Sequence, residues 1–299
     1  MGHFPTPLKT AKVIPIHKSG SKTEVSNYRP ISLLPTLSKI FEKLMYLRLK
    51  TFLAENKILN NNQFGFRPGL NTSDAIVEFL EHAYTSIDEK KHLIAIFLDL
   101  SKAFDTIDHE ILLEKLKHIG IKDMSLKWFH SYIVERKQFV VANSHKSGIK
   151  SLRYGVPQGS TLGPILFLLY INDFGSAINE IKYIQFADDT TLFNSYYDIG
   201  ELNTKINMEL TEVYRWLTVN KLSLNVSKTK FMIISNRQTP NVNIQIQDIN
   251  LERVDEIKFL GVMLDSKLTF KRHILTTGSK IASAVGMMYR LKPLCKFIP

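Results

Sequence analysis

Two adjacent carboxylates, Asp188 and Asp189, lie between two short runs, 183–186 and 190–193, that are rich in strand-forming residues. The pattern predicts a hairpin with both Asp residues at the turn, where an Asp side chain can bond its own backbone. Like charges side by side repel, and a bound divalent cation would offset the repulsion. Mg²⁺ prefers oxygen ligands and binds through one or two carboxylates. The alternative is an exposed polar turn without a ligand.

A second carboxylate site follows the run 93–98, which is continuously apolar and ends at Asp99. This composition is typical of a strand that is buried on both faces. A charge at its end costs free energy unless it is paired or bound to a metal. If this strand and the hairpin are neighbours in one antiparallel sheet, their carboxylates meet. We therefore expect Asp99 to bind a metal, and Asp105 and Asp108 to be structural, with Asp108 capping a helix.

Other segments show helical or strand periodicity. Leu37, Ile40, Phe41 and Leu44 follow the spacing i, i+3, i+4, i+7, which predicts an amphipathic helix over 36–56. Further helices are expected over 74–88, 108–119, 123–135, 162–178, 199–217 and 270–291. Further strands are expected over 13–16, 138–142, 149–154, 231–234, 257–264 with an interruption at Gly261, and 242–246 as an edge strand.

The composition narrows the class of partner. The chain has 299 residues and a formal net charge of +11, which suits a polyanion such as nucleic acid. Its one cysteine, Cys295, excludes an internal disulfide and a zinc site built from Cys, and fits an intracellular protein. The longest apolar run, 165–171, is far shorter than the ~20 residues of a membrane-spanning helix. We therefore expect no membrane segment.

Two loops punctuated by glycine and proline carry ligand-binding candidates. The turn 155–164 contains three glycines, which let a backbone or a ligand approach closely, and Gln158 is its one long amide. The loop 63–69 places Arg67 beside aromatic residues, and Arg can clamp a phosphate or stack on a ring. The alternatives are a plain strand-to-helix connection and an Arg that pairs with a local carboxylate.

The carboxylates suit phosphoryl transfer. Two divalent ions ~3.5–4 Å apart can activate a 3′-hydroxyl and stabilise a leaving group. A hydrolytic enzyme needs a His or Glu to handle water, and none stands beside these motifs in a suggestive place, with His109 as the nearest candidate. This favours nucleotidyl transfer over hydrolysis.

The ordered motifs resemble the reverse transcriptase domain of non-LTR retrotransposons of the LINE type, specifically the jockey-like group. The resemblance covers almost the whole chain and depends on the order of the motifs more than on any single one. The motifs are NYRPIS (27–32), FGFR (64–67), FLDLSKAFD (97–105), GVPQGS (155–160), FADD (186–189), LNVSKTK (224–230) and FLGV (259–262).

The resemblance implies an α+β fold, a right-hand polymerase with an antiparallel-sheet palm, fingers and a partial helical thumb. It implies the following division: fingers over 1–92, a first catalytic palm strand over 93–108, a fingers or palm insertion over 109–155, a palm with the catalytic hairpin and primer-holding region over 156–269, and the start of a truncated thumb over 270–299.

The resemblance also implies roles for individual residues. Metal ligands for two Mg²⁺ ions, or Mn²⁺ in their place, would be Asp99, Leu100 and Asp188, with Asp189 supporting the site. The catalytic set would add Lys228, which protonates pyrophosphate, with Lys230 as a close rival. Nucleotide-binding residues would be Arg67, Leu100, Phe104, Gln158 and Gly159. Phe104 would screen against a ribose 2′-hydroxyl, or else be ordinary core. Primer-holding residues would be Phe259, Leu260 and Gly261.

The implied activity is RNA-directed DNA polymerase, with an RNA template, a DNA primer and dNTPs as partners and substrates, and with a nuclear reaction. The alternatives are a truncated or domesticated remnant that binds RNA without polymerising, a metal-dependent nuclease, and an intron-type maturase. The intact carboxylates favour the polymerase, and the short thumb favours the remnant. No part of the sequence indicates an oligomeric state.

Overall fold

The computed structural model describes residues 2–142 and 144–291, so Cys295 lies outside the described residues. Its centre is a five-stranded sheet in the order β12-β9-β3-β8-β7. Neighbouring strands are antiparallel, except that β12 runs parallel to β9. The strands are β3 (His92–Leu98), β7 (Lys182–Phe186), β8 (Asp189–Tyr196), β9 (Lys230–Ile234) and β12 (Glu252–Arg253).

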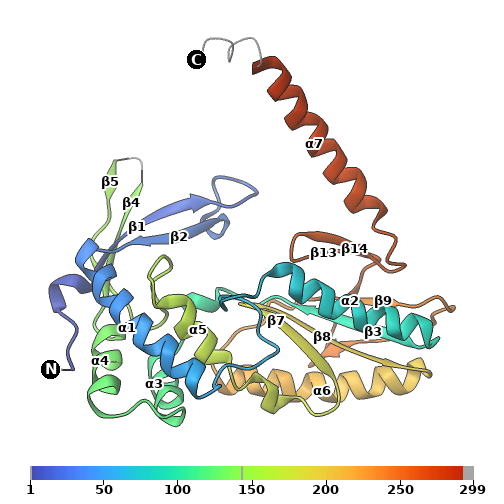
Figure 1. Cartoon of the computed structure of the whole chain (residues 1–299), viewed down its shortest axis with the longest axis horizontal. Helices are drawn as coiled ribbons and strands as arrows, with labels where there is room; N and C mark the ends of the chain where they lie inside the picture. The colour runs from blue at the N-terminus through green and yellow to red at the C-terminus, as the bar shows by residue number, and fades with distance from the viewer. Residues whose placement is uncertain (1, 143, 292–299) are drawn as a thin grey trace.

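All seven residues of β3 are buried, which confirms the predicted strand with two covered faces. Ile94 and Ile96 face one core cluster, together with side chains of α5 (Gly163–Ile171) and α6 (Ile199–Val219). Ala95 and its neighbours on the other face pack with α2 (Thr72–Asp88). Figure 1 shows α6 along one side of this sheet and α2 along the other.

A second sheet is built from the N-terminal part of the chain and a later hairpin. β1 (Thr10–His17) pairs with β2 (Tyr28–Leu33) and with β4 (Lys137–Ala142). The predicted pairing of segments 138–142 and 149–154 is confirmed where β4 meets β6 (Lys150–Ser151), and β5 (His145–Lys146) also joins β4. The helices nearby are α1 (Thr36–Glu55), α3 (His109–His118) and α4 (Asp123–Ile133), and the 3-10 helices are η1 (Thr6–Lys9), η2 (Val25–Asn27), η3 (Ala103–Asp105) and η4 (Phe174–Ala177).

The helix α1 has the predicted bounds but not the predicted buried face. Leu37, Ile40, Phe41 and Leu44 are exposed. The side chains that it buries are Ser38, Glu42, Leu49 and Leu53. Glu42 is tolerated there because it is hydrogen-bonded: it accepts from the Ser38 hydroxyl (2.9 Å) and from the Thr161 backbone amide (2.7 Å).

Three other predictions are corrected. The helix expected over 162–178 ends at Ile171, and the Asn172 side chain then bonds the backbone of Ile58 and Asn60. The segment expected as an edge strand forms instead a small hairpin, β10 (Gln245–Ile246) with β11 (Ile249–Asn250), so β12 is the sheet edge. The segment 257–264 is also a hairpin, β13 (Glu256–Phe259) with β14 (Val262–Asp265), rather than one interrupted strand.

The C-terminal helix α7 (Lys271–Leu291) confirms the predicted helix over 270–291 and extends away from the sheet (Figure 1). None of its described residues is buried. Among the helices of residues 2–142 and 144–291, none combines the length and apolar character needed to cross a bilayer.

Asp108 caps α3, as its position in the sequence predicts. Its Oδ1 accepts hydrogen bonds from the backbone amides of Glu110 (3.0 Å) and Ile111 (3.1 Å), and its Oδ2 accepts one from Lys221 (2.6 Å). Burial works to raise the pKa of Asp108, but the bonds from Lys221 and the two amides outweigh it and hold the pKa below its usual range.

Replacing Asp108 by Ala is expected to lower the free energy of unfolding by about 1–2 kcal/mol at neutral pH, because the helix loses its cap. Because the folded-state pKa is depressed, the contribution is present above the unfolded pKa of about 3.9 and is lost as pH falls through the folded value. Urea titrations of wild type and Asp108→Ala between pH 3 and 7 would measure it. A difference that stays constant across this pH range would contradict the assignment.

Candidate active site

The three carboxylates meet at one end of the central sheet. The β7–β8 hairpin pairs Phe186 with Asp189, so Ala187 and Asp188 are its two turn residues. On the neighbouring strand, Leu98 pairs with Thr190 of β8, and Asp99 follows immediately. The predicted antiparallel neighbourhood is therefore confirmed, and it brings Asp99 to the hairpin turn.

Electrostatics at this turn favours a cation. Burial raises the pKa of Asp188, and the charge of Asp99 raises it further, while Arg29 and Lys18 oppose the shift. Asp189 is exposed on its outer side, yet crowding by protein atoms and the charges of Asp188 and Asp99 raise its pKa to about 6. Excess negative charge of this kind is relieved when a divalent ion binds.

The donor set fits an ion that keeps other ligands. Among the residues that the structure describes, no group of three or more His, Cys, Asp and Glu side chains is placed to hold a metal alone. Mg²⁺ usually takes one or two carboxylates and completes its shell with water, carbonyls and phosphates. The pair of Asp99 and Asp188 suits that mode of binding.

Leu100 offers a backbone ligand. It forms a β-bridge with Leu224, but both hydrogen bonds of this bridge come from the flanking residues. The backbone carbonyl of Asp99 accepts from the Asn225 amide (2.8 Å), and the Ser101 amide donates to the backbone carbonyl of Ser223 (2.8 Å). The carbonyl of Leu100 is therefore not used in the bridge.

The same contacts separate the two lysine candidates. Lys228 is exposed, and its ammonium group has no hydrogen bond or ion pair within the described part of the chain. Lys230 is the first residue of β9, and its ammonium group pairs with Glu252 of β12. Of these two lysines, Lys228 is the one without a partner in the described part of the chain.

Phe104 lies between α5 and the loop 63–67. Its ring stacks on Phe167 of α5 with a centroid distance of 4.6 Å, and Phe66 meets it edge-on at 6.3 Å. It is half-buried, so part of its surface can contact a ligand.

The Gly-rich turn is tied to both β2 and η3. The Gln158 amide group donates to both carboxylate oxygens of Asp105 (2.9 and 3.0 Å), and its backbone carbonyl accepts from the Ser32 amide (2.7 Å). Gly159 has φ +104°, and a Cβ there would lie 3.0 Å from the Ser32 carbonyl oxygen. The position therefore requires glycine.

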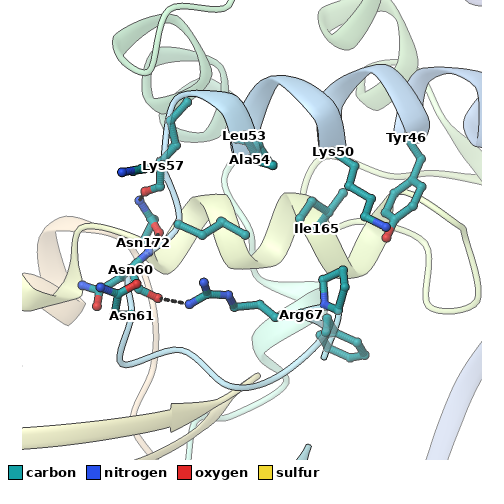
Figure 2. Close-up of a pocket in the computed structure, with 14 residues that line it drawn as sticks. Tyr46, Lys50, Leu53, Ala54, Lys57, Asn60, Asn61, Arg67, Ile165 and Asn172 are labelled. Atoms are coloured by element: carbon teal, nitrogen blue, oxygen red, sulfur yellow. Dashed lines mark hydrogen bonds between the residues drawn. The ribbon is translucent and has the colours of Figure 1, made fainter. Parts of the chain in front are cut away.

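Arg67, expected to bind the nucleotide, is hydrogen-bonded to the backbone of its own loop. Its Nη1 donates to the carbonyls of Asn60 (2.7 Å) and Gln63 (3.2 Å). Figure 2 shows it beside α5 on the loop that carries Asn60, where it lines a pocket together with Tyr46 and Lys50 of α1. The guanidinium group thus stabilises its own loop.

Two other cations, Lys18 and Arg29, interact electrostatically with the carboxylates. Neither of them was assigned a role from the sequence. Lys18 directly follows β1, and Arg29 lies on β2. Both lower the pKa of Asp188, so they lie within electrostatic reach of its carboxylate. The signal in the sequence was the motif 27–32, in which Arg29 is the only charged residue.

The three primer-holding candidates lie at the β13–β14 turn, where Phe259 ends β13 and Leu260 and Gly261 are the turn residues. Leu260 and Gly261 have φ of +45° and +99°, the two positive values of a type I′ hairpin. Phe259 is buried, and its ring packs against Phe79 and Phe97 at centroid distances of 5.3 and 5.7 Å. It anchors the hairpin to the sheet, while Gly261 is exposed at the tip.

Comparison with solved structures places the fold. Telomerase from Candida tropicalis, without its C-terminal domain, matches 89% of this chain and 55% of its own, with a TM-score of 0.58 and 16% identity. Telomerase from the same organism with a fragment of telomeric RNA matches 88% of this chain and 44% of its own, with a TM-score of 0.57 and 14% identity. At this identity the likeness shows the fold, which is that of a right-hand polymerase.

Comparison with curated proteins places the family. The chain is 31% identical over 296 residues to the RNA-directed DNA polymerase from mobile element jockey of Drosophila melanogaster, covering 96% of this chain and 32% of that protein. It is 31% identical over 290 residues to the probable RNA-directed DNA polymerase from transposon BS of the same organism, covering 92% and 31%. The chain thus spans about a third of the length of these relatives.

A family model described as reverse transcriptase (RNA-dependent DNA polymerase) matches residues 16–264, a segment that contains all three carboxylates and both flanking cations. The chain belongs to the reverse transcriptase family and resembles its non-LTR retrotransposon members.

Proposed function

We propose that the chain is the catalytic domain of an RNA-directed DNA polymerase of a non-LTR retrotransposon. It would add dNTPs to a primer 3′-hydroxyl on an RNA template. The observation that carries the proposal is the approach of Asp99 to Asp188 and Asp189 through the pairing of β3 with β8. Asp99, Asp188 and the Leu100 carbonyl would hold two Mg²⁺ ions, or Mn²⁺, supported by Asp189. Such a pair of ions activates the attacking hydroxyl and stabilises the leaving pyrophosphate.

Positive charges would bind the triphosphate from the fingers side. Lys18 and Arg29 already act on Asp188 without a ligand, so they are placed to meet phosphates bound there. Arg67 would also bind the triphosphate. Its Nη1 is occupied by carbonyls of its own loop, so it would use its other guanidinium nitrogens. Lys228 would protonate the departing pyrophosphate, because Lys230, the other candidate, is paired with Glu252.

The remaining candidates would shape the nucleotide and primer sites. Phe104 would lie under the sugar, where its half-buried ring excludes a 2′-hydroxyl. Gln158 and Gly159 would line the pocket on a turn that Asp105 and Ser32 hold in place. The hairpin tip at Leu260 and Gly261 would hold the primer end, with Phe259 as its anchor.

We assign the segments 1–92 and 109–155 mainly to the fingers, 93–108 and 156–269 to the palm, and 270–299 to the start of a thumb. The last assignment is supported by α7, whose described residues are all unburied. Template binding would be electrostatic, sequence-independent and salt-sensitive, given the net charge of +11. The reaction would take place in the nucleus, where chromosomal DNA is the target.

The test is extension of a labelled primer on poly(rA)/oligo(dT) by the purified chain, with Mg²⁺ and dTTP. A polymerase lengthens the primer, and omission of dTTP or addition of EDTA stops it. A nuclease shortens it instead. Binding of the template without any change in primer length would favour the remnant that binds RNA without polymerising.

A further inference from the structure

The loop just before Arg67 runs along the free edge of the central sheet, beside β7. The backbone amide of Gln185 donates to Asn62 (2.8 Å), and the amide of Phe64 donates back to Gln185 (2.8 Å). Gln63 and Gln185 form a parallel β-bridge between these two bonds. The segment 62–64 therefore acts as an additional short strand on the catalytic hairpin.

The Gln63 side chain continues from this strand to the hairpin turn. Its Oε1 accepts from the backbone amide of Ala187 (2.9 Å), and its Nε2 donates to the carbonyl of Ala187 (3.3 Å). The same Oε1 also accepts from the Gly65 amide (2.8 Å). Gln63 is 3% exposed, so one buried amide group bonds both backbone polar groups of the residue that precedes Asp188.

Ala187 needs such a partner. Its φ is +56°, a left-handed conformation that residues other than glycine adopt rarely and at a cost. It is also buried, and within the described part of the chain Gln63 is the partner of both its amide and its carbonyl. A strained backbone at a functional turn persists only when its surroundings hold it.

Gly65 permits the close approach that these bonds require. A Cβ at this position would lie 2.3 Å from the Ala187 nitrogen and 3.0 Å from the Phe186 carbonyl carbon. Any larger side chain would therefore push the loop away from the turn. The absence of a side chain at Gly65 and the reach of Gln63 are two independent features of the same contact.

We propose that Gln63 is a positioning residue for the catalytic hairpin. By holding Ala187 in its left-handed conformation, the Gln63 amide sets the direction in which Asp188 and Asp189 leave the turn, and so the geometry of the metal site. The inference rests on the proposed polymerase function for its catalytic consequence, but its structural part does not. The competing explanation is that Gln63 only fastens the loop 62–65 to β7.

The test compares Gln63→Met with Gln185→Met. Both variants replace a buried glutamine by an apolar side chain of similar length in the same pair of strands. They differ in what the amide bonds, because the Gln185 side chain donates to the Thr190 hydroxyl (3.3 Å) and not to the turn. Three readouts are taken on the full chain: amide hydrogen exchange of the segment 186–189, the dissociation constant for Mn²⁺, and primer extension at increasing Mg²⁺. Gln63→Asn, a shorter amide, serves in addition if Gln63→Met folds poorly.

For Gln63→Met we expect faster exchange at 186–189, Mn²⁺ binding weakened about tenfold, and a higher Mg²⁺ requirement, with template binding unchanged. Gln185→Met should match wild type in Mn²⁺ binding. Wild-type Mn²⁺ binding and Mg²⁺ requirement in Gln63→Met would overturn the proposal and leave only the fastening role. If the wild type extends no primer but exchange and Mn²⁺ binding change as expected, the positioning role stands and the polymerase function fails.

Discussion

Replacing Asp188 by Asn is expected to reduce primer extension by about three orders of magnitude or more while the chain stays folded. The side chain keeps its shape, but it loses the charge that would bind the metal ions, and metal stabilisation of the transition state is worth several kcal/mol, with about 1.4 kcal/mol for each factor of ten. Stability should be unchanged or slightly higher, because burial and the charge of Asp99 already disfavour the ionised carboxylate.

The control for this variant is Asp248→Asn, the same substitution at an exposed position in the β10–β11 turn. It should extend primers at the wild-type rate. The measurements are single-turnover extension rates on poly(rA)/oligo(dT) and thermal unfolding of each variant. Extension by Asp188→Asn within tenfold of wild type would remove Asp188 from the metal site. Loss of cooperative unfolding in Asp188→Asn would show a structural role instead.

Replacing Phe104 by Val is expected to lower the preference for dTTP over UTP by about 10- to 200-fold, the range that a change of shape in an apolar pocket produces. The physical reason is the space that opens beside Phe66 and Phe167, where the ring edge would otherwise meet a 2′-hydroxyl. The rate with dTTP should fall much less than the discrimination.

The measurement is the ratio of kcat/KM for dTTP and UTP on the same primer and template. Phe139→Val, a half-buried residue of β4 in the other sheet, is the matched control and should leave the ratio unchanged. An unchanged ratio in Phe104→Val, together with a lower melting temperature, would mean that this ring is only part of the core.

The local patterns predicted β3 and the β7–β8 hairpin correctly, but the turn consists of Ala187 and Asp188, and Asp189 is the first residue of β8 rather than a turn residue. The sequence contains an apolar run that ends in Asp99 and a pair of Asp residues between strand formers. Together these patterns predict adjacent strands with carboxylates at one end, as the structure has them. The Asp108 cap was also predictable, because capping depends on side-chain and backbone groups only two or three residues apart.

The prediction of which face of α1 is buried was wrong, and the reason can be identified. Helical periodicity reveals which side chains share a face, but it does not reveal which face the rest of the chain covers. Leu37 and Leu44 lie on the apolar side, yet α1 packs through Leu49, Leu53 and the hydrogen-bonded Glu42. A polar residue can replace an apolar one in a core when distant groups satisfy it, as the Thr161 amide does here.

By itself, the sequence determined the family, the order of the elements around the proposed active site and the three candidate carboxylates, because these follow from short motifs and from the local pattern of apolar residues. Tertiary structure alone decided that Gln63 holds Ala187 and that Lys18 and Arg29 act on Asp188. It also decided that Lys230 pairs with Glu252, whereas the Lys228 ammonium group has no partner among the described residues. These contacts join residues distant in the chain, and no local periodicity carries information about a hydrogen bond across 124 residues.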